Sequence, residues 1–193
     1  GAGLVIFGLV EDNDSVARGV SMALHLGNTF LLLAALALTA YWIGGGAPPA
    51  DRSPGGRAGR LFWGSVAAMM LVGVSGAIAA LGDTLFPAAS LAEGLAQDFS
   101  PTSHIFIQLR TFHPFLAVAA GVVMILLVGA VRREKRAQPA RKFANAVNLL
   151  VIIQMVAGGV NIILLAPIWM QLVHLLLADA LWIALVLTGA ALM

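Results

Sequence analysis

The chain has 193 residues, of which 60% are apolar and only 10% are charged. Soluble domains carry about 25% charged residues, so this chain has too few charges to cover the surface of a water-soluble globule. The composition therefore indicates an integral membrane protein. The absence of cysteine excludes a disulfide framework, a thiolate nucleophile and an iron–sulfur cluster. On a membrane protein, the eleven basic residues more often set the orientation than bind nucleic acid.

Five stretches are long and apolar enough to cross a membrane, which takes about 20 residues. These stretches cover residues 16–43, 61–81, 102–131, 143–165 and 168–192. Residues 1–10 form a further half span that is typical of the end of a hydrophobic helix, so we expect a preceding portion of the protein. The predicted fold class is an all-α integral membrane helix bundle.

Basic residues concentrate in two of the polar breaks between these stretches. Nine of the eleven lie within residues 44–60 and 132–142, which the positive-inside rule places in the cytoplasm. The breaks at 11–15 and 82–101 contain acidic residues but no Lys or Arg, and they would face the opposite side. We therefore expect a multi-pass protein of the cell inner membrane with loop 82–101 outside the cytoplasm.

The long outer loop carries a helix signal of its own. Ser90 and Glu93 have the spacing of a capping box, in which two side chains satisfy the free N–H groups at a helix start. Leu91, Leu95 and Phe99 then recur every four residues. The pattern predicts a short amphipathic helix on the outer membrane surface, with a mobile loop as the alternative.

An internal repeat relates the two ends of the chain. Residues 1–9 align with residues 157–165, and each segment is followed by an outer turn and a helix with a His-Leu pair, at His25 and at His174. Membrane proteins are often built from duplicated helix units. If the unit has four helices, the chain divides into the last one and a half helices of one half (1–43), a cytoplasmic linker (44–60) and a complete second half (61–193).

Three of the four histidines lie inside predicted spans, where ionisable side chains are costly and usually functional. His25, His113 and His174 lie about 9–17 Å below the outer surface at 1.5 Å per residue. Axial ligation of haem iron places imidazoles at one level on separate helices. A hydrogen bond from each histidine to a neighbouring helix is the alternative, and we favour haem ligation for His113 together with His174.

Neighbouring polar residues add detail to this hypothesis. Ser21, Asn28 and Thr29 share a helix face with His25, which predicts a polar stripe directed at protein and not at lipid. Arg110 lies one turn outward of His113, where it would meet haem propionates or, alternatively, extend to the lipid headgroups.

Two further ionisable residues are harder to place. His104 begins its span at the interface, so we expect it to contact a loop or a propionate. Asp179 lies deeper in the last span, and the sequence assigns it no role.

Four segments together resemble the heme A synthase family. They are residues 21–26 (SMALHL), 76–87 (GAIAALGDTLFP), 110–113 (RTFH) and 171–178 (QLVHLLLA). The second, a helix end that runs into LGDTLFP, is the most specific. The similarity extends over essentially the whole chain and matches the end of the third helix through the eighth helix of that family.

The resemblance implies eight helices in two four-helix halves related by pseudo-twofold symmetry, each with a histidine pair. By position, His113 and His174 match the pair that holds a haem b, with the propionates near Arg110. His25 matches the second histidine of the pair that holds the substrate, haem O. The first histidine of that pair and a nearby catalytic acid would lie outside this chain.

The activity implied is oxidation of the C8 methyl of haem O to the formyl group of haem A, by successive hydroxylations and loss of water. Implied partners are the lipid bilayer, an electron donor, and haem O synthase or cytochrome oxidase assembly factors, while a homo-oligomer stays open. The chain departs from many members in two respects: loop 82–101 lacks a cysteine pair, and Pro114 follows His113 where Arg is common.

Two other functions compete with this one. The chain could be a haem-b-binding membrane subunit for electron transfer or assembly that makes no haem A, or a structural bundle without haem. A preceding helix with a second histidine in register and a nearby acid would favour the enzyme.

Overall fold

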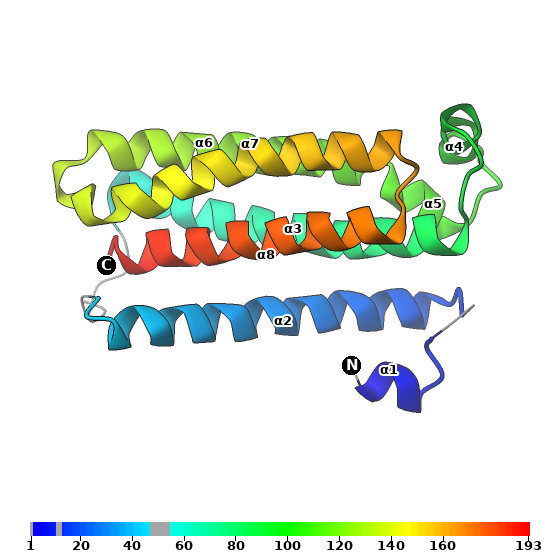
Figure 1. The fold of residues 1–193 in the computed structure, drawn as a ribbon, viewed down its shortest axis with the longest axis horizontal. Helices are drawn as coiled ribbons and strands as arrows, with labels where there is room; N and C mark the ends of the chain where they lie inside the picture. Colours follow the sequence, from blue (N-terminus) through cyan, green and yellow to red (C-terminus); the bar gives the residue numbers. More distant parts are fainter. Residues whose placement is uncertain (1, 11–12, 47–54) are drawn as a thin grey trace.

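The computed structural model describes residues 2–10, 13–46 and 55–193, and the regular elements within them are all helices (Figure 1). In chain order these are α1 (Ala2–Ile6), α2 (Val16–Ile43), α3 (Gly56–Leu85), α4 (Leu91–Asp98), α5 (Ile105–Arg110), α6 (His113–Arg133), the 3-10 helix η1 (Lys135–Ala140), α7 (Arg141–Ile163) and α8 (Ile168–Ala190). Five spans in this part of the chain are long and apolar enough to cross a membrane. The prediction of an all-helical membrane bundle is confirmed.

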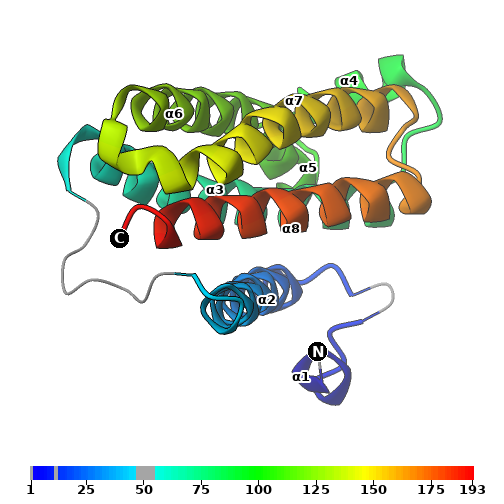
Figure 2. The same ribbon diagram turned by 60° about the vertical axis from the view of Figure 1, so that its left-hand side comes forward.

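Four long helices form the body of the molecule. α3 packs along α6, α7 packs along both α6 and α8, and α2 lies against α3 and α8 at the side of this bundle (Figures 1 and 2). The short helices α4 and α5 lie at the end of the bundle far from the C-terminus (Figure 1). That end corresponds to the predicted outer side.

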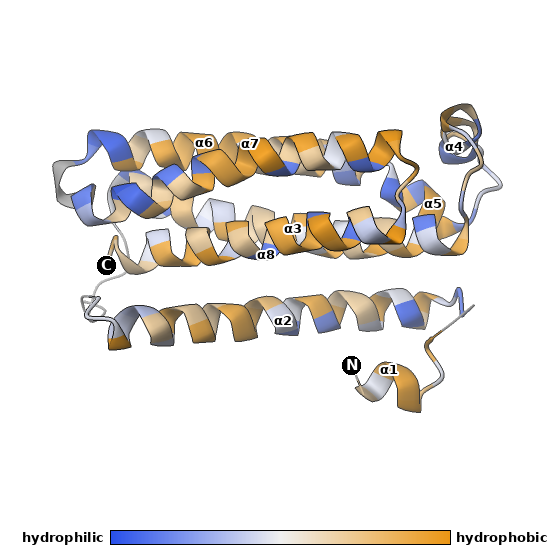
Figure 3. Cartoon of the chain, viewed as in Figure 1, coloured by the Kyte–Doolittle hydropathy of each residue, from blue (hydrophilic) through white to orange (hydrophobic). Residues whose placement is uncertain are grey.

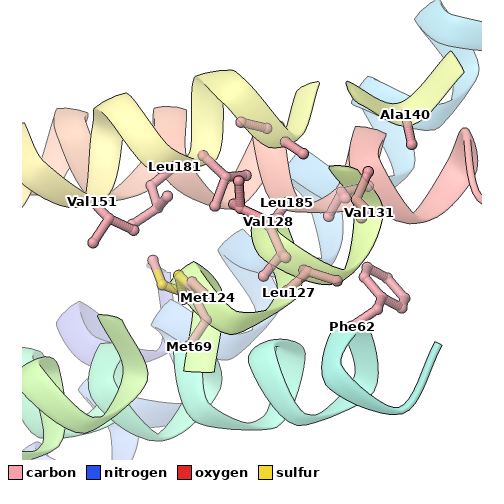
Figure 4. Packing of buried hydrophobic residues seen from close by; sticks show 14 of the residues in the cluster. Phe62, Met69, Met124, Leu127, Val128, Val131, Ala140, Val151, Leu181 and Leu185 are labelled. Carbon is pink, nitrogen blue, oxygen red and sulfur yellow. The ribbon is translucent and has the colours of Figure 1, made fainter. Parts of the chain in front are cut away.

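The tightest packing is at the opposite end, near the basic loops. Leu127 and Val131 of α6 and Leu185 of α8 are completely buried, and Phe62 of α3 packs against Gly189 of α8 (Figure 4). Towards the predicted outer side the side chains are less enclosed. Residues 70–80 of α3 and 113–119 of α6 include no buried residue. The bundle is therefore closed at one end and more loosely packed at the level of the histidines.

The long helices carry apolar side chains on their outer surfaces. Large exposed hydrophobic residues run along α2, α6 and α7, and polar residues gather towards the helix ends (Figure 3). Such a surface would be an aggregation hazard in water but suits a hydrocarbon environment.

The structure departs from the predicted spans in two places. α3 begins at Gly56, so the helix includes the last residues of the predicted linker 44–60, of which residues 47–54 lie outside the described part of the chain. The predicted span 102–131 is broken between α5 and α6. Pro114 explains the break, because it has no N–H to donate to the carbonyl one turn back.

The amphipathic helix predicted in the outer loop is present as α4. Ser90 Oγ accepts a hydrogen bond from Glu93 N at 3.2 Å, and Glu93 Oε2 accepts one from Ala89 N at 2.9 Å. The capping box thus starts the helix as predicted. Leu95 and Phe99 remain exposed, as is required of a face that contacts a membrane surface.

Candidate functional site

Two of the predicted histidines meet between helices α6 and α8. The ring centres of His113 and His174 are 6.5 Å apart, and the ring planes are almost perpendicular at 84°. His113 is the first residue of α6, directly after the break between α5 and α6, and His174 lies in the second turn of α8. Residues 61 positions apart in the chain thus come to the same level of the bundle.

His113 is oriented by helix α3. Ser75 Oγ lies 3.0 Å from His113 Nδ1 and donates its own hydrogen to Val72 O at 2.9 Å. Gly76 lets the ring lie against α3, because a Cβ at that position would be 3.0 Å from His113 Cε1. The Ser75-Gly76 pair therefore both holds the imidazole and makes room for it.

Helix α7 plays the same part for His174, with different groups. Gln154 Nε2 lies 3.2 Å from His174 Nε2 and donates to the backbone oxygen of His174 at 3.1 Å. A Cβ on Gly158, one turn along α7, would lie 3.3 Å from His174 Cε1. Each imidazole thus packs against a glycine of the neighbouring helix, beside one polar side chain.

The turn between α7 and α8 fixes this register. Leu165 and Ala166 both adopt positive φ angles, 60° and 51°, which cost non-glycine residues about 1–2 kcal/mol each. Gln171 Nε2 donates to Ala166 O at 2.7 Å. The strained turn is thus tied to the first turn of α8, just before His174.

The donor set suits a haem better than a metal ion held by protein alone. No group of three or more His, Cys, Asp or Glu side chains able to hold a metal occurs among the described residues. Haem needs only two protein ligands, because the porphyrin supplies the other four. An ion bound to two imidazoles at about 2 Å each separates the ring centres by about 6 Å, close to the distance between His113 and His174.

Unsatisfied polar atoms also gather at this place. His174 Nδ1 and Gln154 Oε1 are buried and make no hydrogen bond. Unsatisfied buried polar atoms are rare and commonly mark a functional position. The residues present therefore fit a haem held between α6 and α8.

His25, the third predicted ligand, lies apart from this pair. It is exposed on α2, as is Asn28, while Ser21 and Thr29 are half-buried. Thr29 Oγ1 donates to the backbone oxygen of His25 at 3.0 Å. The polar stripe exists on a face of α2 other than the one that carries Phe30 towards α3 and α8. That this stripe is directed at protein stays a prediction.

Arg110 lies in an ionic cluster at the outer end. Its Nε donates to Asp98 at 2.7 Å and its Nη1 to Asp83 at 2.9 Å, while its side chain is only 10% exposed. It therefore joins α5 to α3 and α4 and does not extend to lipid headgroups. Its predicted contact with haem propionates remains a prediction, and a propionate would have to compete with two carboxylates.

The two remaining ionisable residues have different surroundings. His104 caps α5 by accepting from Phe106 N at 3.3 Å, and its ring stacks on Phe86 with centres 4.9 Å apart. The predicted loop contact of His104 also exists, since its Nε2 lies 3.9 Å from Asp14 Oδ2. Asp179 has a buried oxygen that makes no hydrogen bond, and its role stays unassigned.

Sequence reasoning missed the residues that support the histidines. Ser75 and Gln154 are polar residues within apolar spans, which was an available signal. The packing of Gly76 and Gly158 on the rings had no signal, because the pattern does not show which helix faces which. The structure also explains the glycine of the LGDTLFP motif. Gly82 lets the backbone of α5 approach α3, because a Cβ on Gly82 would lie only 3.1 Å from Phe106 O.

Comparison with known proteins agrees with this arrangement. Residues 1–186 match the COX15-CtaA family model, described as a cytochrome oxidase assembly protein. Two curated relatives from different strains of Thermus thermophilus, each named protoheme IX farnesyltransferase, are 42% identical over 186 residues, which is 96% of this chain. The chain spans about 30% of the length of these relatives. No solved structure matches it significantly.

The family match covers nearly the whole chain, and it agrees with the fold and with the resemblance seen in the sequence. A multi-pass helical membrane protein of this family is consistent with all three. The chain belongs to the COX15-CtaA family of cytochrome oxidase assembly proteins.

Proposed function

We propose that this chain is the haem-binding part of a heme A synthase-type oxidoreductase, with His113 and His174 as the axial ligands of haem b. The observation that carries the proposal is the 6.5 Å separation of two imidazoles from different helices. A bound haem b would supply one-electron transfer to the site. The residues of the chain hold and orient it, through Ser75 at His113 and Gln154 at His174.

We further assign haem O as the substrate and His25 as a ligand of its iron. The C8 methyl would be oxidised to a formyl group through two hydroxylations and loss of water. Each hydroxylation would consume one O₂, two electrons from a partner electron donor and two protons, and would release one water. The name of the Thermus relatives supports this substrate. They are named for farnesylation of protohaem IX, and haem O is a farnesylated haem, so a segment like this one in the same chain would receive the product directly.

The proposal includes the orientation in the membrane. The loops rich in Arg and Lys, 44–60 and 132–142, would face the cytoplasm, and α4 would lie on the outer surface of the inner membrane. The haem b site would then lie in the outer half of the bilayer. Haem O synthase and other cytochrome oxidase assembly factors are the partners that this placement favours.

One observation favours a second function. His25 is exposed on α2, away from the His113–His174 pair, so the pair is complete without it. A haem-b subunit that transfers electrons, and makes no haem A, would need only that pair. The two functions differ in whether haem O is converted.

Haem extraction separates the two functions. Membranes from cells that express the complete gene would be supplied with haem O, and their haems extracted and separated. The oxidoreductase is supported if wild-type membranes convert haem O to haem A, and if His25→Ala membranes lose this conversion but retain haem b. Unconverted haem O in membranes that contain the protein loaded with haem b contradicts it and leaves the electron-transfer function.

A further inference from the structure

The two paired histidines differ in what contacts their ring nitrogens. Ser75 Oγ gives its hydrogen to Val72 O, so it accepts one from His113 Nδ1. The proton of neutral His113 is therefore on Nδ1, and its lone pair is on Nε2. Because the proton is on Nδ1, Nε2 of His113 is the nitrogen that can bind a metal.

At His174 the equivalent nitrogen is engaged. The Gln154 amide atom that lies 3.1 Å from His174 O must be the NH₂ nitrogen, because a carbonyl oxygen only accepts hydrogen bonds. The same nitrogen lies 3.2 Å from His174 Nε2 and donates its second hydrogen there. His174 Nε2 therefore holds a lone pair, and the proton is on Nδ1, which is buried without a hydrogen-bond partner.

A metal ion and Gln154 would compete for one lone pair. A neutral imidazole binds metal through the nitrogen without the proton, which in His174 is the nitrogen that Gln154 occupies. The bond from Gln154 to the His174 backbone oxygen uses the other amide hydrogen, so it is compatible with both states. Gln154 Oε1 makes no hydrogen bond, so nothing on that side of the amide opposes its rotation.

We propose that Gln154 is a positioning residue that occupies the metal-binding nitrogen of His174 until haem arrives. His113 Nε2 would thus be the first nitrogen available to hold haem, and His174 Nε2 would become available only when the Gln154 hydrogen bond is released. The hydrogen bond from Gln154 keeps the proton of His174 on Nδ1. It also delays the binding of His174 Nε2 to the haem iron. The inference rests on the proposed haem b site.

Titration of the haem-free protein in detergent with haem b, followed by absorbance, tests this proposal. In Gln154→Leu nothing competes for the lone pair, so haem should bind about two- to tenfold more tightly, the range expected for loss of one neutral hydrogen bond. Gln108→Leu is the matched control: Gln108 Nε2 also donates to a backbone oxygen, Ser103 O at 2.9 Å, but it lies on α5 and makes no hydrogen bond to an imidazole. This control should bind haem like the wild type.

Gln154→Glu should act in the opposite direction. A carboxylate accepts hydrogen bonds, so it would draw the His174 proton to Nε2 and remove the lone pair that iron needs. We expect binding about tenfold weaker than in the wild type. If Gln154→Leu instead weakens haem binding, as the loss of a purely structural support would, the proposal is wrong.

Nitrogen-15 NMR of histidine in the haem-free protein gives a second readout. It should show the Nδ1–H tautomer for both His113 and His174, and in Gln154→Glu only His174 should change to Nε2–H. A wild-type His174 protonated on Nε2 overturns the inference whatever the haem titration shows. If the wild type binds no haem, the proposed function is wrong as well. If the wild type binds haem as tightly as Gln154→Leu or more tightly, only this inference is wrong.

Discussion

Histidines occur in two very different settings in this molecule. In the C-terminal bundle, defined as α3 with α5 to α8, His113 and His174 face each other and each is held by a polar side chain of a neighbouring helix. In the N-terminal segment, α1 and α2, His25 lies on an exposed helix face. Only Gly19 and Phe30 of α2 are buried. The comparison teaches that α3 and α7 support the His113–His174 pair, whereas His25 lies on a face of α2 that the described helices leave exposed.

The largest effect is expected from variants of the paired histidines, which should lose haem from the C-terminal bundle. His113→Ala and His174→Ala each remove one of the two proposed haem ligands, so we expect haem b per polypeptide to fall at least about tenfold on purification. The measurement is haem content by the pyridine haemochrome assay. His104→Ala, which removes a histidine at the loop, is the control and should retain haem. Full haem content in both variants would contradict the site.

The ionic cluster at the outer end gives the next effect. Arg110→Gln leaves Asp83 and Asp98 close together, without the charge that joins them. Removal of one partner from a buried ion pair costs about 3–5 kcal/mol. The two carboxylates are about a quarter exposed, so solvent screening reduces this cost. We expect a loss of about 2–3 kcal/mol in the free energy of unfolding.

Thermal unfolding in detergent measures the effect of Arg110→Gln. Limited proteolysis should also show cleavage within α4, because that helix loses its tie to α5. Adding Asp98→Asn should recover part of the lost stability. An unchanged melting temperature would show that the cluster is not a structural link.

The glycines beside the two imidazoles allow a comparison within the bundle. An added Cβ would lie 3.0 Å from His113 in Gly76→Ala but 3.3 Å from His174 in Gly158→Ala. Because Ser75 also restrains His113, we expect Gly76→Ala to cost about 1–2 kcal/mol and Gly158→Ala less. Chemical unfolding of the two variants side by side checks the order, and the reverse order would refute the account of ring packing.

The contact between the two regions gives the smallest effect. Trp182 Nε1 of α8 donates to Phe30 O of α2 at 2.7 Å, and the two rings stack with centres 5.0 Å apart. Trp182→Phe keeps a stacked ring but loses the hydrogen bond, so we expect about 1 kcal/mol of destabilisation. Equilibrium unfolding measures it. A loss of several kcal/mol would mean that α2 and the bundle form one tightly coupled unit.

Much of this fold could be predicted because lipid leaves few choices. Apolar runs predicted α2 within its observed limits, Val16–Ile43, and the capping box of Ser90 and Glu93 predicted α4. The break before α6 was missed although Pro114 was visible, because a span is recognised by its length and hydrophobicity and membrane helices tolerate proline.

The candidate site was predictable only in part. Depth placed His113 and His174 at one level, since depth follows from position along a helix. The supporting contacts of Gln154 and the carboxylate partners of Arg110 depend on how helices rotate about their axes, which nearly uniform apolar surfaces do not encode. For the same reason the sequence does not show that His25 and Phe30 lie on different faces of α2, of which the one with Phe30 packs against the bundle.

The central claim is that the paired histidines of the bundle hold a haem without His25. Near-infrared magnetic circular dichroism of the oxidised haem identifies its axial ligands and tests this claim most directly. The account predicts a bis-imidazole signal of equal intensity per haem b in the wild type and in His25→Ala, and no such signal in His113→Ala. A wild-type haem without two imidazole ligands, or a bis-imidazole signal that disappears in His25→Ala, would contradict it.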